Sequence, residues 1–134
     1  MQVKAVSVVQ PWADAILYYG KNVENRKWWK ARYRGWLVIH ASSTRPRPEV
    51  MREAVAATGD RTVGSVRGAA LGVVELTGVC SPWRCTCRSE WAEPGAYHLH
   101  LRNPRPLPEP IPCRGATQLW APPLEVLAQV ARLV

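Results

Sequence analysis

The fold of this chain is decided by residues 20–42, which read GKNVENRKWWKARYRGWLVIHAS. The last part, Trp36–Ala41, follows Gly35 and is an almost continuous apolar run that is typical of a strand. The part before it, Lys21–Arg34, is polar and basic and contains Trp28 and Trp29. We expect it to form a short strand followed by a loop.

Outward from this stretch, strands outnumber helices. On the N-terminal side, Val3–Val9 is β-branched and predicts a strand, and Pro11 fits the first turn of a helix that ends at Gly20. The strongest strand on the C-terminal side is Ala69–Val79. The other expected elements are a helix from about Pro48 to Ala57, a strand at Ala96–Arg102, an extended proline-rich edge at Asn103–Pro112, a short strand at Gln118–Trp120 and a helix at Leu124–Leu133.

These elements predict an α+β fold. The strands are connected irregularly and lack the alternating strand–helix rhythm of a doubly wound sheet. We therefore expect a small, mostly β-barrel-like sheet with two or three packed helices, since a closed or nearly closed barrel hides strand edges in a short chain. The length of 134 residues corresponds to one domain over residues 1–134.

Composition excludes several classes of protein. The apolar fraction of 47% excludes a chain that is disordered throughout. No window approaches 18 unbroken apolar residues, and the start MQVKAVSVVQPW has no apolar signal-peptide core. We expect a cytoplasmic monomer that makes no contact with membranes.

The charge is basic and uneven. The net charge is +8, and residues 1–67 hold 12 basic and 5 acidic side chains. The chain also has seven Trp and no Phe. Arginine and lysine neutralise phosphates and indoles stack on bases, so the composition favours a nucleic-acid partner. A protein that merely prefers arginine remains the alternative.

The four cysteines form no CxxC pair, and without an export signal we do not expect disulfides. The alternative is a zinc site formed by Cys80, Cys85, Cys87 and Cys113 with His98 or His100. Their spacing matches no zinc pattern, and Cys85 and Cys87 would point to opposite faces of a strand. We expect reduced, partly buried thiols, with no metal and no cofactor.

His98 and His100 alternate with leucines, so both face the same side of their strand. With no third ligand in that segment, we expect exposed strand surface there.

The candidate site lies in the short strand. If Val23–Trp28 is extended, Glu24, Arg26 and Trp28 share one face. A carboxylate can accept from an exocyclic amine, a guanidinium can bind phosphate or carbonyl oxygens, and an indole can stack on a base. The alternative is a surface ion pair beside a structural tryptophan.

The sequence resembles the ASCH family, which belongs to the PUA-like superfold of small β-barrels. The resemblance runs from Val6 to about Trp120. It is carried by S-x-x-Q-P-W-A from Ser7, G-K-x-x-E-N-R from Gly20, I-H-A-S from Ile39, G-x-V-E-L from Gly72 and Q-L-W from Gln118. The family places a glycine two residues before the lysine, whereas this chain has Tyr19 there and Gly20 next to Lys21.

The resemblance implies a basic, Trp-lined cleft between the barrel and the first helix. Its ligand would be RNA, another single-stranded nucleic acid or a modified nucleobase. Lys21 and Arg26 would engage phosphate or carbonyl oxygens, and Glu24 and Asn25 would read the base edge. The other expected site residues are two stacking indoles and two residues at the pocket mouth: Trp28, Trp12, His40 and Ser42. For His40, a histidine bonded to backbone is an equal alternative.

Some ASCH relatives are enzymes, which gives a second hypothesis of a small hydrolase. One branch resembles amidohydrolases acting on N4-acetylcytidine with a lysine, a threonine three residues later and a glutamate. Here Lys21 matches the lysine but Glu24 replaces the threonine, so the pair would have to activate a water. Another relative is a ribonuclease, for which Lys21, Arg26 and His40 would be the basic cluster. Burial would make Lys21 a base, whereas pairing with Glu24 would keep it charged.

Overall fold

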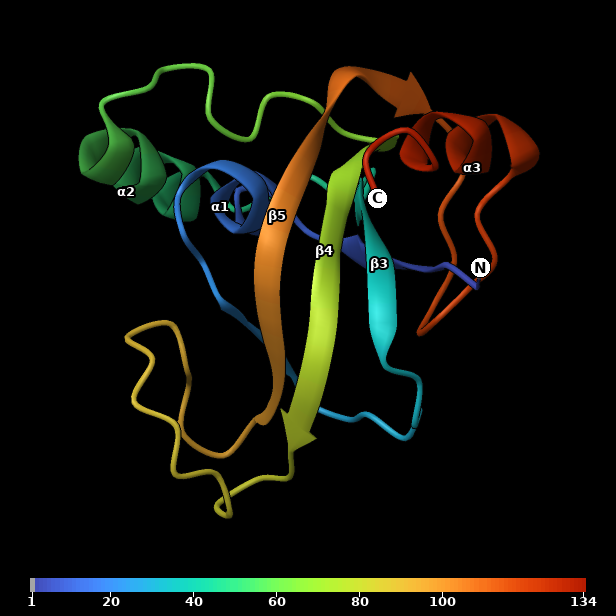
Figure 1. The fold of residues 1–134 in the computed structure, drawn as a ribbon. Coiled ribbons are helices and arrows are strands. Elements are labelled where there is room, and N and C mark those ends of the chain that lie inside the picture. Colours follow the sequence, from blue (N-terminus) through green and yellow to red (C-terminus); the bar gives the residue numbers. More distant parts are fainter. Residues whose placement is uncertain (1) are drawn as a thin grey trace.

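The computed structural model describes residues 2–134 and shows one five-stranded sheet with three helices (Figure 1). The strand order is β1-β3-β4-β5-β2, with β1 parallel to β3 and the other pairs antiparallel. The elements are β1 Lys4–Val8, α1 Trp12–Tyr18, β2 Val23–Arg26, β3 Gly35–Ala41, α2 Pro48–Thr58, β4 Ala69–Cys80, β5 Tyr97–Pro112 and α3 Leu124–Val130. The predicted α+β class is confirmed. The strand expected at Gln118–Trp120 is reduced to one bridge, between Ala5 and Trp120.

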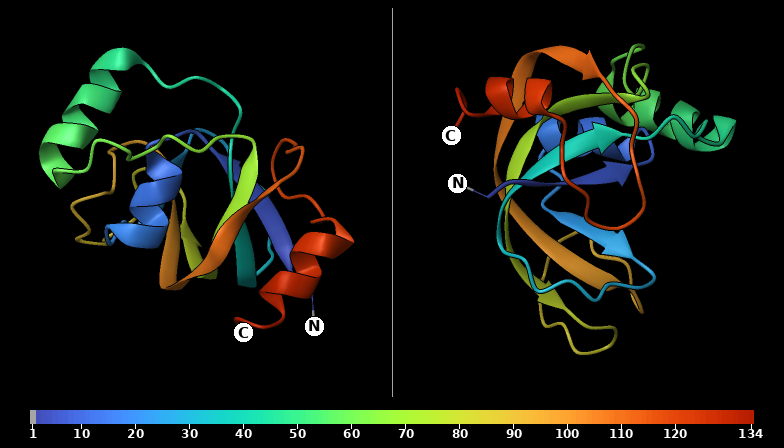
Figure 2. Two further views of the ribbon diagram at one scale, coloured as in Figure 1. Left: turned by 90° about the horizontal axis from the view of Figure 1, so that it is seen from above. Right: turned by 90° about the vertical axis from the view of Figure 1, so that its right-hand side faces the viewer.

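The sheet is curled into a half-barrel, as the view from the side shows (Figure 2). Its outer strands are β1 and β2, and no backbone ladder joins them within residues 2–134. A side chain links them instead, because Arg26 on β2 donates from Nη2 to the carbonyl of Ser7 on β1 at 2.7 Å. The barrel is therefore open at this seam, and the seam lies beside Glu24.

The two faces of the sheet bury two separate clusters, because alternate residues of a strand point to opposite faces. On one face, α1 packs Ile16 and Leu17 against strand residues such as Leu37 and Leu99. On the other face, α3 packs against alternate strand residues that include Val38. Helix α2 has no buried residue and extends away from the sheet (Figure 1). None of the helices in residues 2–134 has the length and apolar character to cross a bilayer.

The proline-rich segment continues the strand that begins at Tyr97, and together they form β5. Strand β2 pairs only with Tyr97–His100, so beyond that point one side of β5 is an edge, as predicted. The prolines occupy every second position from Pro104 to Pro112. Since alternate residues of an antiparallel strand direct their backbone groups to opposite sides, this spacing leaves the other residues free to bond β4.

Candidate functional site

Lys21 is positioned by the end of α1. Gly20 has φ +75°, a left-handed conformation that glycine adopts without strain, and it turns the chain so that the Lys21 amide donates to the carbonyl of Ala15 at 3.0 Å. The start of α1 is fixed by the buried side chain of Gln10, whose Oε1 accepts from the Asp14 amide at 3.0 Å. Trp12 and Lys21 therefore stand at the two ends of one short, anchored helix.

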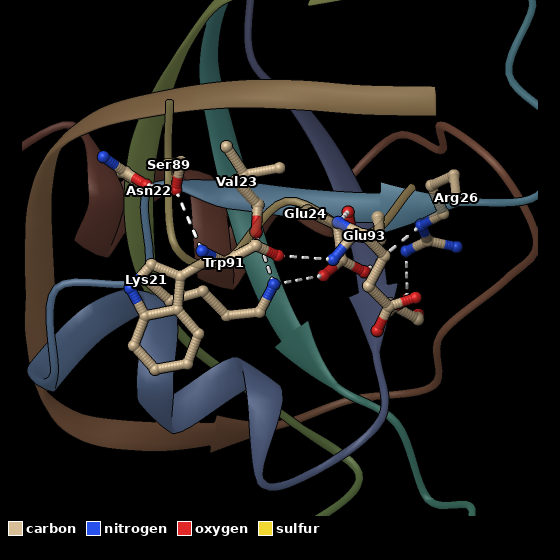
Figure 3. Close-up of polar contacts among 10 residues, drawn as sticks. Lys21, Asn22, Val23, Glu24, Arg26, Ser89, Trp91 and Glu93 are labelled. Carbon is tan, nitrogen blue, oxygen red and sulfur yellow. Dashed lines mark hydrogen bonds and ion pairs between the residues drawn. The ribbon is translucent and has the colours of Figure 1, made fainter. Parts of the chain in front are cut away.

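Glu24 lies between two cations (Figure 3). One carboxylate oxygen is 3.4 Å from Lys21 Nζ and the other is 3.3 Å from Arg26 Nε. Glu24 is only 8% exposed and Lys21 only 5%. Lys21 Nζ also donates to the carbonyl of Val23. Because the polar contacts of Arg26 are internal, to Glu24 and the Ser7 carbonyl, its guanidinium holds Glu24 in place and links β2 to β1 across the open seam.

Burial lowers the pKa of the Lys21 ammonium from its ordinary value of 10.5, and the carboxylate of Glu24 acts in the opposite direction. Both effects expected from the sequence are therefore present, and burial is the larger. Lys21 is a hydrogen-bond donor that releases its proton more readily than a surface lysine.

A long loop, residues 81–96, folds back over β2. Asn25 holds it with both ends of its amide: Nδ2 donates to the carbonyl of Trp91 at 2.8 Å, and Oδ1 accepts from the Glu93 amide at 2.9 Å. Ser89 also donates to the Asn22 side chain (Figure 3). The role of Asn25 is thus to fasten the loop that brings Trp91 and Glu93 to Lys21.

These elements enclose a cavity of about 300 Å³, near the lower end of the range of roughly 300–1,000 Å³ for small-molecule sites. Lys21 Nζ lies 5.8 Å from the ring centre of Trp12 and 5.9 Å from that of Trp91. The cavity therefore combines two indoles with an ammonium and a carboxylate. It is lined by Trp12, Lys21, Glu24, Asn25, Glu90, Trp91, Ala92 and Glu93.

Sequence reasoning missed the loop half of this cavity. Trp91 and Glu93 follow Asn25 by more than sixty positions, and their only signal was a tryptophan between two glutamates in a loop.

The lining is not basic, contrary to the sequence-based expectation. Three carboxylates, from Glu24, Glu90 and Glu93, face one ammonium, that of Lys21. The basic side chains gather instead in the segment after β2, which reads KWWKARYR over residues 27–34 and whose four Lys and Arg side chains are all exposed. A carboxylate-rich cavity repels phosphate and accepts hydrogen bonds from amines, so it suits an uncharged, donor-bearing group.

The remaining predicted site residues lie elsewhere. Strand β2 ends at Arg26, so the shared face expected through Trp28 stops two residues early, and Trp28 is 54% exposed outside the cavity. His40 and Ser42 line a second cavity of about 410 Å³. There His40 is buried, with Nδ1 3.0 Å from Ser7 Oγ and Nε2 2.8 Å from the Cys113 carbonyl. Both ring nitrogens are occupied, as in the backbone-bonded alternative, and Lys21 and His40 form no common basic cluster.

Comparison with known proteins places the fold and the family. The model of the ASCH domain matches residues 6–110. The chain belongs to the ASCH family. Solved structures similar to this ASCH chain include that of ASCH from Zymomonas mobilis, with 15% identity, a TM-score of 0.59 and coverage of 98% of this chain and 94% of that one. A mutant of the same protein gives 16% identity, a TM-score of 0.59 and coverage of 99% of both chains. Among curated proteins, no match was found.

The ASCH cavity holds no side-chain hydroxyl or thiol among its lining residues. Glu24, at the position of the threonine in the amidohydrolase-like relatives, uses both carboxylate oxygens on neighbouring cations. The lining therefore offers hydrogen-bond donors, acceptors and stacking faces, but no hydroxyl or thiol nucleophile of the kind that forms covalent intermediates.

The cysteines and histidines of this ASCH chain differ from expectation in several respects. Cys80, Cys85 and Cys87 are free and partly buried, as predicted, but they converge with two histidines. His98 is 7% exposed, so the expected exposed surface is wrong for it. Cys85 and Cys87 lie in the loop and not in a strand, so they do not point to opposite faces of a strand as expected. Cys113 lies apart, beside His40.

Proposed function

We propose that this ASCH domain binds RNA or another single-stranded nucleic acid and takes one base, ordinary or modified, into the cavity between α1 and the loop 81–96. One observation carries the proposal: the Lys21 ammonium, paired with the Glu24 carboxylate, lies close to the ring centres of both Trp12 and Trp91, 5.8 Å from the first and 5.9 Å from the second. Flat aromatic faces bind bases by stacking, and paired donors and acceptors read a base edge. The family's association with nucleic acids supports the same conclusion.

The polar groups favour a base that carries an amine and a carbonyl on the same edge. Lys21 Nζ has three N–H donors and only donates, which suits a carbonyl oxygen. The carboxylates of Glu24 and Glu93 only accept, which suits an exocyclic amine. Cytosine and guanine present both groups, whereas uracil presents two carbonyls and no amine. We therefore expect a preference for cytosine or guanine, or a modified form of either, over uracil.

The phosphates bind outside the cavity in this proposal. Three carboxylates in the lining disfavour a phosphate there. The exposed basic side chains of residues 27–34 are the nearest in sequence to the cavity-lining strand, and the half-exposed Trp28 among them offers a further stacking face. Base recognition and backbone attraction are thus assigned to different residues, so they can be separated by mutation.

Lys21→Met and Lys30→Met make that separation, because each removes one ammonium, the first inside the cavity and the second on the exposed segment. Binding to labelled ten-nucleotide oligo-C, oligo-G and oligo-U is followed by fluorescence anisotropy over a salt series. Lys21→Met should weaken oligo-C or oligo-G binding at least tenfold and leave the salt dependence unchanged. Lys30→Met should weaken all three oligonucleotides by a similar factor and reduce the slope of log K against log salt by about 0.7 per lost phosphate contact.

The proposal fails if Lys21→Met, with an unchanged circular dichroism spectrum, binds all three oligonucleotides as the wild type does. It also fails if the wild type binds none of them at low salt.

The second candidate function is hydrolysis of an acylated nucleoside or of RNA. It is favoured by the lowered pKa of Lys21, which together with Glu24 would have to activate a water. Incubation with N4-acetylcytidine and with labelled RNA tests it directly. A product that disappears in Lys21→Met would identify an enzyme, whereas binding without turnover would identify a reader.

A further inference from the structure

Three thiols and two imidazoles converge where β4 ends and β5 begins. Cys80 is the last residue of β4, Cys85 and Cys87 lie in the loop, and His98 and His100 lie on one face of β5. Cys80 Sγ is 3.0 Å and Cys85 Sγ is 3.7 Å from His100 Nε2, and Cys87 Sγ is 3.7 Å from His98 Nδ1. Each of the two triads that share Cys85 has all its donor atoms within 4.8 Å of one another.

Two of these three separations match the edges of a tetrahedral zinc site, whereas that between Cys80 Sγ and His100 Nε2 is shorter, at 3.0 Å. With Zn–S of about 2.3 Å and Zn–N of about 2.0–2.1 Å, tetrahedral angles place two sulfurs about 3.8 Å apart and a sulfur and a nitrogen about 3.6 Å apart. Two of the sulfur–nitrogen distances are 3.7 Å. Three cysteines with one histidine are a ligand set of structural zinc sites, and soft thiolates favour zinc over magnesium or calcium.

The environment of His98 also fits a metal ligand. Its Nε2 is 2.6 Å from the backbone carbonyl of Glu93, so the proton on that nitrogen is donated to the carbonyl. Nδ1 then presents its lone pair toward Cys87. Zinc-bound histidines are commonly oriented in this way, with the second ring nitrogen bonded to a carbonyl or carboxylate.

We propose that Cys80, Cys85 and Cys87, with His98 or His100 as the fourth ligand, bind one structural zinc ion, which draws together Cys80 and Cys87 from their separate triads. The site is distinct from the cavity and goes beyond the proposed function. The ion would anchor residues 81–96, which contain no helix or strand and carry Trp91 and Glu93. The bond from His98 to the Glu93 carbonyl connects the metal site directly to the cavity wall. Metal binding supplies stability that a long loop without secondary structure lacks.

The zinc content of the purified chain tests the proposal independently of nucleic-acid binding. The untagged chain, purified without chelators under reducing conditions, should contain one zinc per chain by plasma mass spectrometry. Cys85→Ser removes the ligand common to both triads and should lose the zinc. Cys113→Ser is the matched control, because Cys113 belongs to neither triad, and it should keep the metal. Of His98→Ala and His100→Ala, the variant that loses zinc identifies the fourth ligand.

Reconstitution keeps the test valid if a variant misfolds. The wild-type chain stripped of metal should bind one Co²⁺ with thiolate-to-cobalt charge-transfer absorption, and zinc should displace it. Four titratable thiols with no bound metal and no cobalt spectrum would overturn the proposal. So would zinc content that is equal in the wild type and in a folded Cys85→Ser. Loss of nucleic-acid binding with zinc retained would count against the proposed function and leave the metal site standing.

Discussion

Replacing Glu24 by glutamine tests whether its carboxylate holds the site together. The substitution keeps the side chain's size, removes its charge and replaces one of its two acceptor oxygens by an NH2 donor. In the folded chain it leaves the ammonium of Lys21 and the guanidinium of Arg26 without their shared counter-charge, with side-chain exposures of 4% and 22%. Removing one member of a buried ion pair is strongly destabilising, because the remaining charge stays desolvated and uncompensated.

The expected loss is about 3 kcal/mol, the lower end of the range of about 3–5 kcal/mol for a broken buried pair, since Arg26 keeps partial access to water. For 134 residues, an unfolding entropy of about 2.1 cal/mol/K per residue converts each kcal/mol to about 3.5 °C in Tm. Glu24→Gln should therefore melt about 10 °C below the wild type at pH 7. The deficit should shrink as the pH rises, because Lys21, already lowered in pKa by burial, then loses its proton.

Glu75→Gln is the matched control for this prediction. It makes the same chemical change in a pair with Arg102, whose Nε lies 3.1 Å from Glu75 Oε1, with side-chain exposures of 64% for the arginine and 27% for the glutamate. Such a solvent-exposed pair contributes little to stability, because water and salt screen it. Thermal unfolding followed by circular dichroism compares the two variants, and equal melting temperatures would refute the account of Glu24.

Three other contacts give predictions of their own. The pKa of Lys21 in the folded chain lies below 10.5, so between the folded pKa and 10.5 the unfolded chain binds more protons than the folded chain. The urea midpoint of the wild type should therefore rise with pH in that window, and it should rise less in Lys21→Met. Parallel curves for the two proteins would contradict this. Gly72→Ala would place a Cβ 2.6 Å from the Arg105 carbonyl oxygen and should lower the free energy of urea unfolding by about 1–3 kcal/mol. Gly78→Ala is the control and should lower it less, because a Cβ there lies 3.8 Å from its nearest neighbour. The reverse order would be inconsistent with this packing. Asn25→Ala removes both hydrogen bonds from the Asn25 amide to the loop and should speed proteolysis within residues 81–96. Asn103→Ala, the control, should not. Equal cleavage patterns in the two variants would show that Asn25 does not fasten the loop.

The fold could be predicted from local patterns. The apolar run at Trp36–Ala41 and the mostly apolar run at Ala69–Val79 form largely buried strands, and the helix expected between Pro11 and Gly20 is α1. Each of these signals lies within one element, so it needs no knowledge of distant contacts. The alternating prolines likewise predicted an edge along β5, because proline has no backbone N–H to donate to a neighbouring strand.

The cavity could be predicted only on the side of β2. Lys21 and Glu24 lie three residues apart in the sequence, and their pairing was one of the two alternatives that the sequence left open. Trp91 reaches them through the bond from Asn25 to its carbonyl, a contact between residues 66 positions apart that no periodicity encodes.

The same limit applies to the thiols. Their convergence depends on how the loop between β4 and β5 closes, and a strand-based argument about Cys85 and Cys87 could not describe a loop.

Insertion of a base into the cavity would be seen in a crystal structure of the chain with a short oligonucleotide that contains cytosine and guanine. The account predicts one base inserted between Trp12 and Trp91, with its carbonyl on Lys21 Nζ and its amine on a carboxylate, and with its phosphates toward residues 27–34. A bound strand with every base outside an empty cavity would contradict it.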